Sequence, residues 1–323
     1  IWPIREQNSR TGLTTARTHQ TKDFMKVCLG MSPIAWSNDD LPELGGETSL
    51  ETCLHETRSA GYTGTETGGK FPRDVAALGE VLQAHDLKLV SGWYSGTLLG
   101  REVEEEKDQI AAQLQLFSAL GASVMVYGET WNTVQNRRDR TLSQRPVIDP
   151  DDIPAYGRRL SVLAAHCQEQ GVPLVFHHHM GTGVETEAEL DLVMSHTGEE
   201  VGLLLDTGHM CFAGGDIARV IEHHGRRIKH VHAKDIREDV LAGVDRERMS
   251  FLDCVLDGVF TVPGDGAIDF QSVAQCLAVA GYEGWVIVEA EQDPARANPF
   301  EYAKKGYKSL ASALTDAGYE INA

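Results

Sequence analysis

Short apolar runs alternate with helical patterns along nearly the whole chain, and this alternation restricts the possible folds more than any other feature of the sequence. Eight runs rich in Val, Leu and Ile predict strands at residues 27–31, 64–67, 87–93, 123–127, 173–177, 201–205, 228–232 and 285–289. Because these runs lack regular polar alternation, they are typical of strands buried on both faces of a parallel sheet.

A helical pattern follows each predicted strand. The first is capped by Ser49 and stops before Gly61, the second begins at Pro72, and the others cover residues 104–120, 153–170, 186–195, 216–223, 269–280 and 299–317. Strict alternation of eight strands with eight helices predicts an α/β fold, a single (β/α)8 TIM barrel. The competing doubly wound sheet is disfavoured because no Gly-x-Gly-x-x-Gly sequence follows the first strand.

Three of the connections that follow predicted strands are long. They come after strands 1, 4 and 7 and cover residues 32–48, 128–152 and 233–266. In a barrel, the connections that follow strands all emerge at the face where active sites are built. The long segments therefore predict the walls of a small-molecule pocket.

Polar residues gather where the predicted strands end. They are Glu66, Glu129, His177, His178, His179, Asp206, His209, His232, Lys234, Glu289 and Glu291. Among them, Asp206, His232 and Glu289, with His177 as a fourth, provide two carboxylates and two imidazoles, a common ligand set for a divalent metal ion. Strand alternation places His177 and His179 on one face and His178 on the other. His179, on the same face as His177, is therefore an alternative fourth ligand. Glu129, at the end of the fourth predicted strand, is a further alternative.

Several sequence blocks resemble known families. DTGH at 206–209 and HVHAKD at 230–235 resemble the xylose-isomerase-like sugar phosphate isomerase/epimerase barrels. Longer blocks resemble the myo-inosose-2 dehydratase family within that superfamily, namely PIAWSNDDLPELGG at 33–46, VFHHHMGTGVET at 175–186 and WVIVEAEQDPARANPFEYA at 285–303. The resemblance implies a hydro-lyase that converts 2-keto-myo-inositol (scyllo-inosose) to a trihydroxycyclohexane dione plus water in inositol catabolism. It also implies Mn²⁺ or Co²⁺, with Zn²⁺ or Fe²⁺ as alternatives, and a requirement for glutathione.

Carried over position by position, the resemblance matches Asp206, His232 and Glu289 to metal ligands of the family. His177 departs from it, because the isomerases and epimerases have Glu there. This departure suits a dehydratase, which needs unlike groups to remove a proton and to release a hydroxide.

The roles expected for the remaining site residues follow from that chemistry. Glu289 or Glu291 is expected to take the proton, and His209 or His179 to protonate the leaving hydroxyl. Lys234 and Glu66 are expected to bind substrate hydroxyls. A purely structural ion pair with Asp235 or Glu291 is the alternative for Lys234.

The charge balance limits the classes of partner. With 29 basic and 48 acidic side chains the net charge is −19, which repels a phosphate backbone and disfavours a nuclease on a related barrel. No apolar run approaches the ~20 residues of a membrane span. The predicted partner is therefore a small polyol ketone, with no nucleic acid and no membrane, and a homo-oligomer is compatible with the sequence. A cofactor-free ketose isomerase or epimerase on the same barrel is the nearest alternative function, ahead of a sugar-binding barrel without activity.

Residues 1–24 differ from the rest of the chain in being rich in Thr and Ser, and they contain no apolar segment of a secretory signal. We expect them to be an extension, disordered or upstream of a natural start at Met25, and residues 25–323 to form the catalytic barrel. Six scattered cysteines without a Cys-x-x-Cys pair predict reduced thiols and a cytoplasmic protein.

Overall fold

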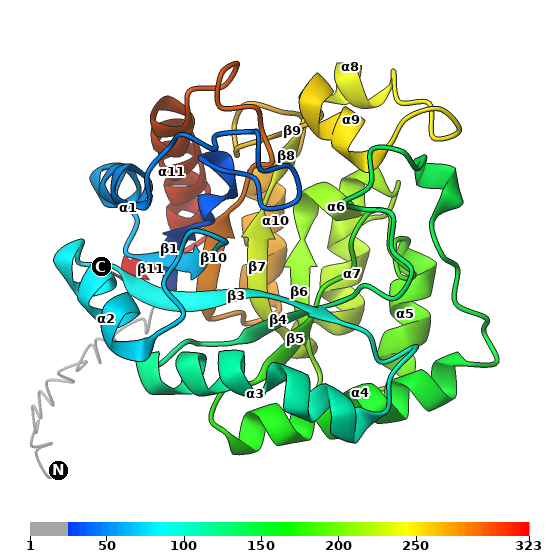
Figure 1. Ribbon diagram of the computed structural model, residues 1–323. Coiled ribbons are helices and arrows are strands. Elements are labelled where there is room, and N and C mark those ends of the chain that lie inside the picture. Colours follow the sequence, from blue (N-terminus) through cyan, green and yellow to red (C-terminus); the bar gives the residue numbers. More distant parts are fainter. Residues whose placement is uncertain (1–24, 323) are drawn as a thin grey trace, which may run out of the picture.

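Eight parallel strands form a closed barrel in the computed structural model, which describes residues 25–322. They are β1 (Met25–Met31), β2 (Gly64–Thr67), β3 (Lys88–Gly96), β4 (Met125–Glu129), β5 (Leu174–Phe176), β6 (Gly202–Asp206), β7 (Ile228–Ala233) and β10 (Gly284–Val288). Each of these strands pairs with the next of the eight, and β10 closes the ring by pairing with β1 (Figure 1). In that pairing Val27 lies opposite Gly284. The predicted (β/α)8 barrel is confirmed. The predicted extension, 1–24, lies outside the described residues.

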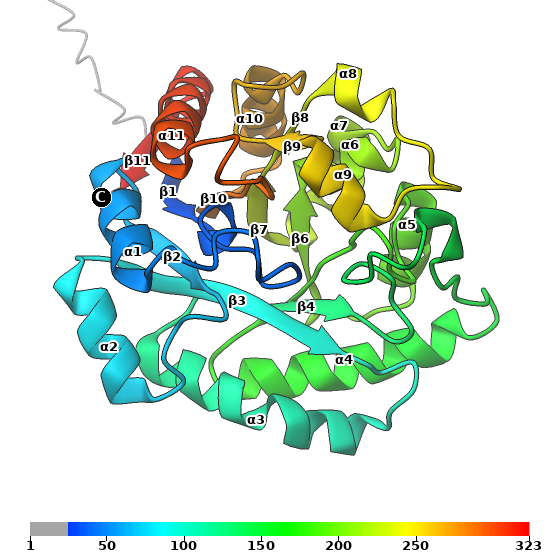
Figure 2. The ribbon, with the colours of Figure 1, turned by 45° about the horizontal axis from the view of Figure 1, so that its top comes forward.

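Helices surround the strands (Figure 2), and eight of them form the outer ring of the barrel. They are α1 (Leu50–Ser59), α2 (Val75–Ala84), α3 (Val103–Leu120), α4 (Ile153–Glu169), α5 (Glu187–Ser195), α7 (Ile217–His224), α10 (Phe270–Val279) and α11 (Pro299–Asp316). Ser49 caps α1 as predicted, its hydroxyl accepting the N–H of Thr52. The predicted start of the second helix at Pro72 is wrong: Asp74 accepts the N–H of Ala77, and this cap begins the helix at Val75.

Several short elements were not predicted. They are α6 (Thr207–Phe212), α8 (Glu238–Leu241), α9 (Phe251–Asp257), the antiparallel pair β8 (Asp235–Ile236) and β9 (Phe260–Thr261), and three 3₁₀ turns at Pro33–Ala35, Leu142–Gln144 and Gly225–Arg227. A further strand, β11 (Tyr319–Asn322), pairs with the first residues of β1. Most of these elements lie within the long connections.

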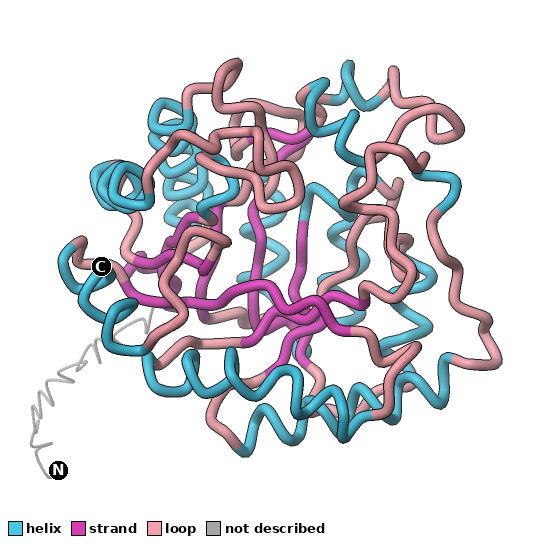
Figure 3. Tube along the Cα trace, viewed as in Figure 1, coloured by secondary structure: helices cyan, strands magenta, loops and turns pink. Residues whose placement is uncertain are grey.

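The long connections gather at one end of the barrel (Figure 3). They join β1 to α1, β4 to α4, and β7 to α10, the last carrying α8, α9 and the β8–β9 pair. This is the end at which the strands finish, so the connections stand around the carboxyl ends of the strands, as predicted. Within residues 25–322, no helix is both long and apolar enough to cross a membrane.

Candidate metal centre

Strand alternation turns four polar side chains into the barrel. In β6, Leu203 and Leu205 pack in the core shared with the helices, whereas Leu204 packs inside the barrel with valines of neighbouring strands. Because successive side chains alternate, Asp206 follows Leu204 to the inside. The same pattern holds at the ends of β5, β7 and β10, where the residue before each inward position packs in the core shared with the helices, and it directs His177, His232 and Glu289 inward.

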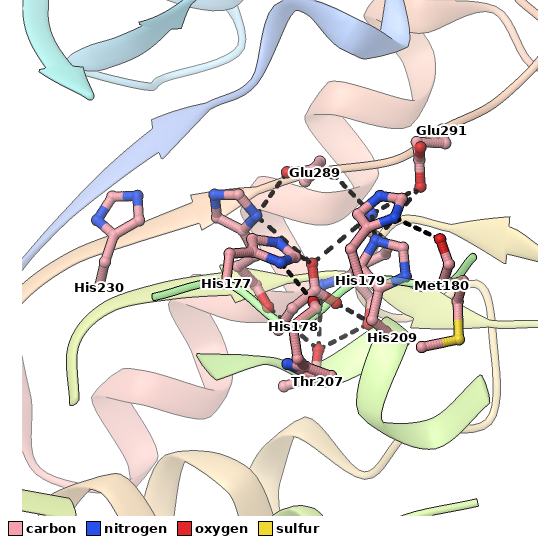
Figure 4. A network of polar contacts seen from close by, with 12 residues as sticks. His177, His178, His179, Met180, Thr207, His209, His230, Glu289 and Glu291 are labelled. Carbon is pink, nitrogen blue, oxygen red and sulfur yellow. Dashed lines mark hydrogen bonds and ion pairs between the residues drawn. The ribbon is translucent and has the colours of Figure 1, made fainter. Parts of the chain in front are cut away.

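These four side chains meet at one buried point. The Oδ2 atom of Asp206 lies 3.4 Å from Nδ1 of His232 and 3.5 Å from Nε2 of His177. Nδ1 of His232 lies 2.6 Å from Oε2 of Glu289. Figure 4 shows His177 below Glu289 in this network. The structure therefore brings together the four residues that the sequence predicted as metal ligands.

The residues fit a divalent metal ion. Oδ2 of Asp206 is buried and has no hydrogen-bond partner among residues 25–322, and Nδ1 of His232 faces two carboxylate oxygens, those of Asp206 and Glu289. Two ligands about 2.1 Å from a tetrahedral ion lie roughly 3.4 Å apart, which matches the two distances to Asp206. Mixed carboxylate and imidazole ligands suit Mn²⁺, Co²⁺, Zn²⁺ and Fe²⁺.

The electrostatics of the cluster also favour a cation. Burial would raise the pKa of Glu289, but His232 and Lys234 outweigh it and hold that pKa at about 2. Lys234 and the surrounding histidines likewise hold the pKa of Asp206 well below its ordinary value. Nearby carboxylates, with Glu289 the strongest, raise the pKa of His232 well above the usual range in spite of its burial. These buried carboxylates remain ionised and together attract positive charge.

Backbone carbonyls set the protonation of the two inward histidines after β5. Nδ1 of His177 contacts the carbonyl oxygen of His178, and Nδ1 of His179 donates to the carbonyl oxygen of Met180 at 2.8 Å. A carbonyl only accepts, so each Nδ1 carries the proton and each Nε2 is left as a lone-pair nitrogen. Nε2 of His177 faces Asp206. The centre of the His179 ring instead lies 4.0 Å from the centre of the His209 ring.

Glu129, the other alternative for the fourth ligand, is engaged elsewhere. It accepts the Tyr127 hydroxyl at 2.8 Å and the N–H of Trp131 at 3.1 Å. Among the described residues, it belongs to none of the groups with metal-ligand spacing. The geometry therefore favours His177.

Glu66 lies on the far side of His232. Its Oε1 atom accepts from Nε2 of His232 at 3.0 Å, from Nε2 of His230 at 3.1 Å and from the Ser91 hydroxyl at 2.6 Å. A carboxylate that holds the second nitrogen of a ligand imidazole orients it and increases its basicity. Sequence reasoning missed His230 and Ser91, although the His-x-His spacing of β7 already places His230 on the inner face.

Lys234 is fully buried among anionic groups. Its Nζ atom lies 2.6 Å from Oε1 of Glu289, 2.8 Å from Oε2 of Glu291 and 3.0 Å from Nε2 of His209. The ion pair with Glu291, which was the alternative to substrate binding for Lys234, is therefore present. The alternative pair with Asp235 is not, because the Asp235 carboxylate accepts four backbone N–H groups instead.

A cavity of about 120 Å³ opens over the cluster. Its polar lining includes Asp39, Asp40, Glu66, Gln135, His177, His179, His232, Glu289 and Glu291, with Trp93 on one wall. Sequence reasoning did not single out Asp39, Asp40, Gln135 or Trp93, although two consecutive acids in a long connection were a usable signal. His209 and Lys234 are not among the lining residues; they lie beneath His179 and Glu291.

The chain belongs to the xylose isomerase-like TIM-barrel family, whose model matches residues 54–313. Among solved structures, the IolI protein with a bound zinc atom superposes with a TM-score of 0.59 at 19% identity, covering 91% of this chain and 98% of IolI. L-ribulose 3-epimerase superposes with a TM-score of 0.60 at 18% identity, covering 90% and 95%. At these identities the likeness concerns the fold.

Sequence relatives are closer. An inosose dehydratase of Geobacillus thermodenitrificans is 46% identical over 282 residues, which are 87% of this chain and 95% of the relative. The rhizopine catabolism protein MocC of Rhizobium meliloti is 49% identical over 299 residues, 93% and 92% of the two chains. The predicted relation to the inosose dehydratases is confirmed, and with it the predicted enzyme class, a hydro-lyase.

Proposed function

We propose that this chain removes water from scyllo-inosose to give a trihydroxycyclohexane dione, as a step of inositol catabolism. The relatives named inosose dehydratase support this substrate. The observation that carries the proposal is a single small cavity lined both by metal-ligand side chains and by two unlike proton-transfer groups, His179 and Glu291.

Asp206, His232, Glu289 and His177 would hold the divalent ion. When bound, it supplies a Lewis acid that draws electrons from the ketone oxygen and acidifies the adjacent carbon. The imidazole ligands favour Mn²⁺ or Co²⁺, with Zn²⁺ or Fe²⁺ as alternatives, over Mg²⁺, which prefers oxygen ligands. A glutathione requirement stays a prediction from the family resemblance.

His179 takes the proton from the carbon beside the ketone. Burial, the neighbouring His177 imidazole and the Lys234 ammonium lower the pKa of His179 to about 3, so its imidazole is neutral. Its Nδ1 proton is held by the Met180 carbonyl. The Nε2 lone pair at the cavity is therefore free to accept a proton. With so low a pKa it is a weak base, so the transfer depends on the acidity that the bound ion would give to the carbon beside the ketone.

Glu291 gives a proton to the departing hydroxyl, which leaves as water. Burial, together with repulsion from Glu289, raises the pKa of Glu291 to about 7 although Lys234 opposes the shift. Such a carboxyl group carries a proton for a large share of the time at neutral pH. The Lys234 ammonium, 2.8 Å away, stabilises the carboxylate that remains, and the enol left by water loss tautomerises to the dione.

This assignment exchanges the roles expected from the sequence, in which a glutamate was the base and a histidine the acid. His209, which is fully buried and contacts Lys234, acts in this scheme as a positioning residue. Glu66 orients the His232 ring, and the Lys234 ammonium stabilises the carboxylates of Glu289 and Glu291.

Turnover of scyllo-inosose tests the proposal. Purified protein stripped with EDTA should be inactive, and Mn²⁺ or Co²⁺ should restore release of the dione, followed by NMR, with Mg²⁺ much poorer. Full activity in chelator would exclude the metal. Conversion of ketoses without water loss would instead support the isomerase or epimerase alternative.

Exchange of the substrate proton in D₂O separates the two catalytic roles. Glu291→Gln should still exchange the proton beside the ketone but lose dehydration by roughly 10²–10⁴-fold. His179→Gln should lose both reactions, whereas exposed His196→Gln should lose neither. Exchange retained by His179→Gln and lost by Glu291→Gln would return the base role to the glutamate.

A further inference from the structure

Four groups of the described residues have metal-ligand spacing, and just one of them, here called the second group, shares no member with the centre of His177, Asp206, His232 and Glu289. It consists of His179, His209 and Glu291, all buried, with one donor atom of each within 4.8 Å of the others. Nε2 of His209 lies 3.7 Å from Oε2 of Glu291, which is close to the roughly 3.4 Å between two ligands of one tetrahedral ion. By residue type and spacing alone, this group could bind a second ion.

A positive group already occupies the position. Nζ of Lys234 contacts two members of the second group, Glu291 and His209, at 2.8 and 3.0 Å. It also contacts Glu289 at 2.6 Å and lies 3.6 Å from Oδ2 of Asp206, between the two groups. The ion pair between Lys234 and Glu291 is shielded from solvent, because Lys234 is fully buried and Glu291 is 2% exposed.

The chain is shaped to admit this ammonium. A Cβ atom at Gly208 would come within 2.6–2.8 Å of three carbons of the Lys234 stem, so only glycine leaves room for the lysine there. The hydroxyl of Thr207 donates to the backbone carbonyl of Lys234 at 2.7 Å, and Nζ lies 5.0 Å from the centre of the Phe260 ring. Both Thr207 and Gly208 come from the DTGH motif that follows β6.

We propose that the Lys234 ammonium takes the place of a second metal ion, so that the chain binds a single divalent ion. Lys234 brings one charge to Glu289 and Glu291, and a second ion at His209 and Glu291 would stand within contact distance of that ammonium. Like charges so close inside a protein strongly repel each other. The inference does not depend on the reaction, because it concerns the number of ions bound without substrate.

Counting bound ions tests the proposal. Native mass spectrometry of stripped protein titrated with Zn²⁺ should show one ion per chain in the natural sequence, even with excess Zn²⁺. Lys234→Met, which keeps the volume and removes the charge, should bind two. Lys234→Arg keeps the charge and should bind one. Adding Glu291→Gln to Lys234→Met removes a ligand of the second group and should return the count to one.

Either of two results would overturn the proposal: two specific ions on the natural chain, or a folded Lys234→Met chain that binds only one. Circular dichroism establishes folding, and Lys234→Met is refolded in Zn²⁺ if it does not fold without it. If it folds under no condition, the count on the natural chain decides, with one ion in support and two against.

Discussion

At the scale of single residues, we expect the contact between Glu66 and His232 to influence the affinity of the proposed centre for its metal ion. Glu66→Gln removes the charge that orients Nε2 of His232, so metal affinity should fall about 10–100-fold while the fold persists. A Mn²⁺ titration measures this, with Glu80→Gln on the exposed face of α2 as the control. Unchanged affinity with weakened substrate binding would instead make Glu66 the hydroxyl-binding residue that the sequence predicted.

The sequence could predict which polar side chains turn into the barrel because each one ends a strand, and the strand pattern fixes on which side it lies. It could not predict the partners of Glu66, since Ser91 and His230 meet it across the barrel from other strands. The protonation of His179 and Glu291 also depends on burial and on the ammonium of Lys234, which only the folded arrangement specifies.

At the scale of elements, the eight barrel strands were predictable because each buries a nearly continuous apolar run, and their helices because apolar residues recur every three or four positions. The antiparallel pair of β8 and β9 escaped prediction because each strand has only two residues, and α6 because it is six residues long and contains Gly208. Such short elements depend on tertiary contacts rather than on a sequence period. They nevertheless shape the connection that follows β7.

Asp235 organises that connection. Its two oxygens accept the N–H groups of Ile236, Gly264, Gly266 and Ile268 at 2.8–3.1 Å. In Asp235→Asn the amide NH₂ would face backbone donors, so we expect a loss of about 1–3 kcal/mol of unfolding free energy and faster hydrogen exchange at residues 264–268. Urea unfolding and exchange mass spectrometry measure these, with exposed Asp108→Asn as the control. Unchanged exchange would show that the connection is held by other contacts.

At the scale of the whole molecule, the net charge of the chain and the charge of the cavity lining are both negative. The net charge is −19, and five carboxylates line the cavity, those of Asp39, Asp40, Glu66, Glu289 and Glu291. None of the described residues that line it is Lys or Arg. Even with a divalent ion and Lys234 included, negative charge exceeds positive charge there. The cavity should therefore prefer uncharged polyols to phosphorylated ones.

Competition against scyllo-inosose measures this preference. An inositol phosphate monoester should inhibit at least about 100-fold more weakly than unphosphorylated myo-inositol, because like charges brought together cost several kcal/mol. Asp40→Asn removes one cavity carboxylate and should reduce the difference in inhibition between the phosphate monoester and myo-inositol. Burial and the neighbouring Asp39 raise the pKa of Asp40 to about 6, so the difference should also narrow as the pH falls through 6. Equal inhibition by the two compounds at pH 8 would contradict the account.

Anomalous scattering from crystals soaked in Mn²⁺ tests most directly the central claim that His177, Asp206, His232 and Glu289 form the metal centre. The account predicts one peak per chain, within about 2.0–2.3 Å of Nδ1 of His232 and of oxygens of Asp206 and Glu289, with Nε2 of His177 as the fourth ligand. Coordination by Nε2 of His232 together with Glu66 and His230, by His179 in place of His177, or no peak at the cluster would contradict it.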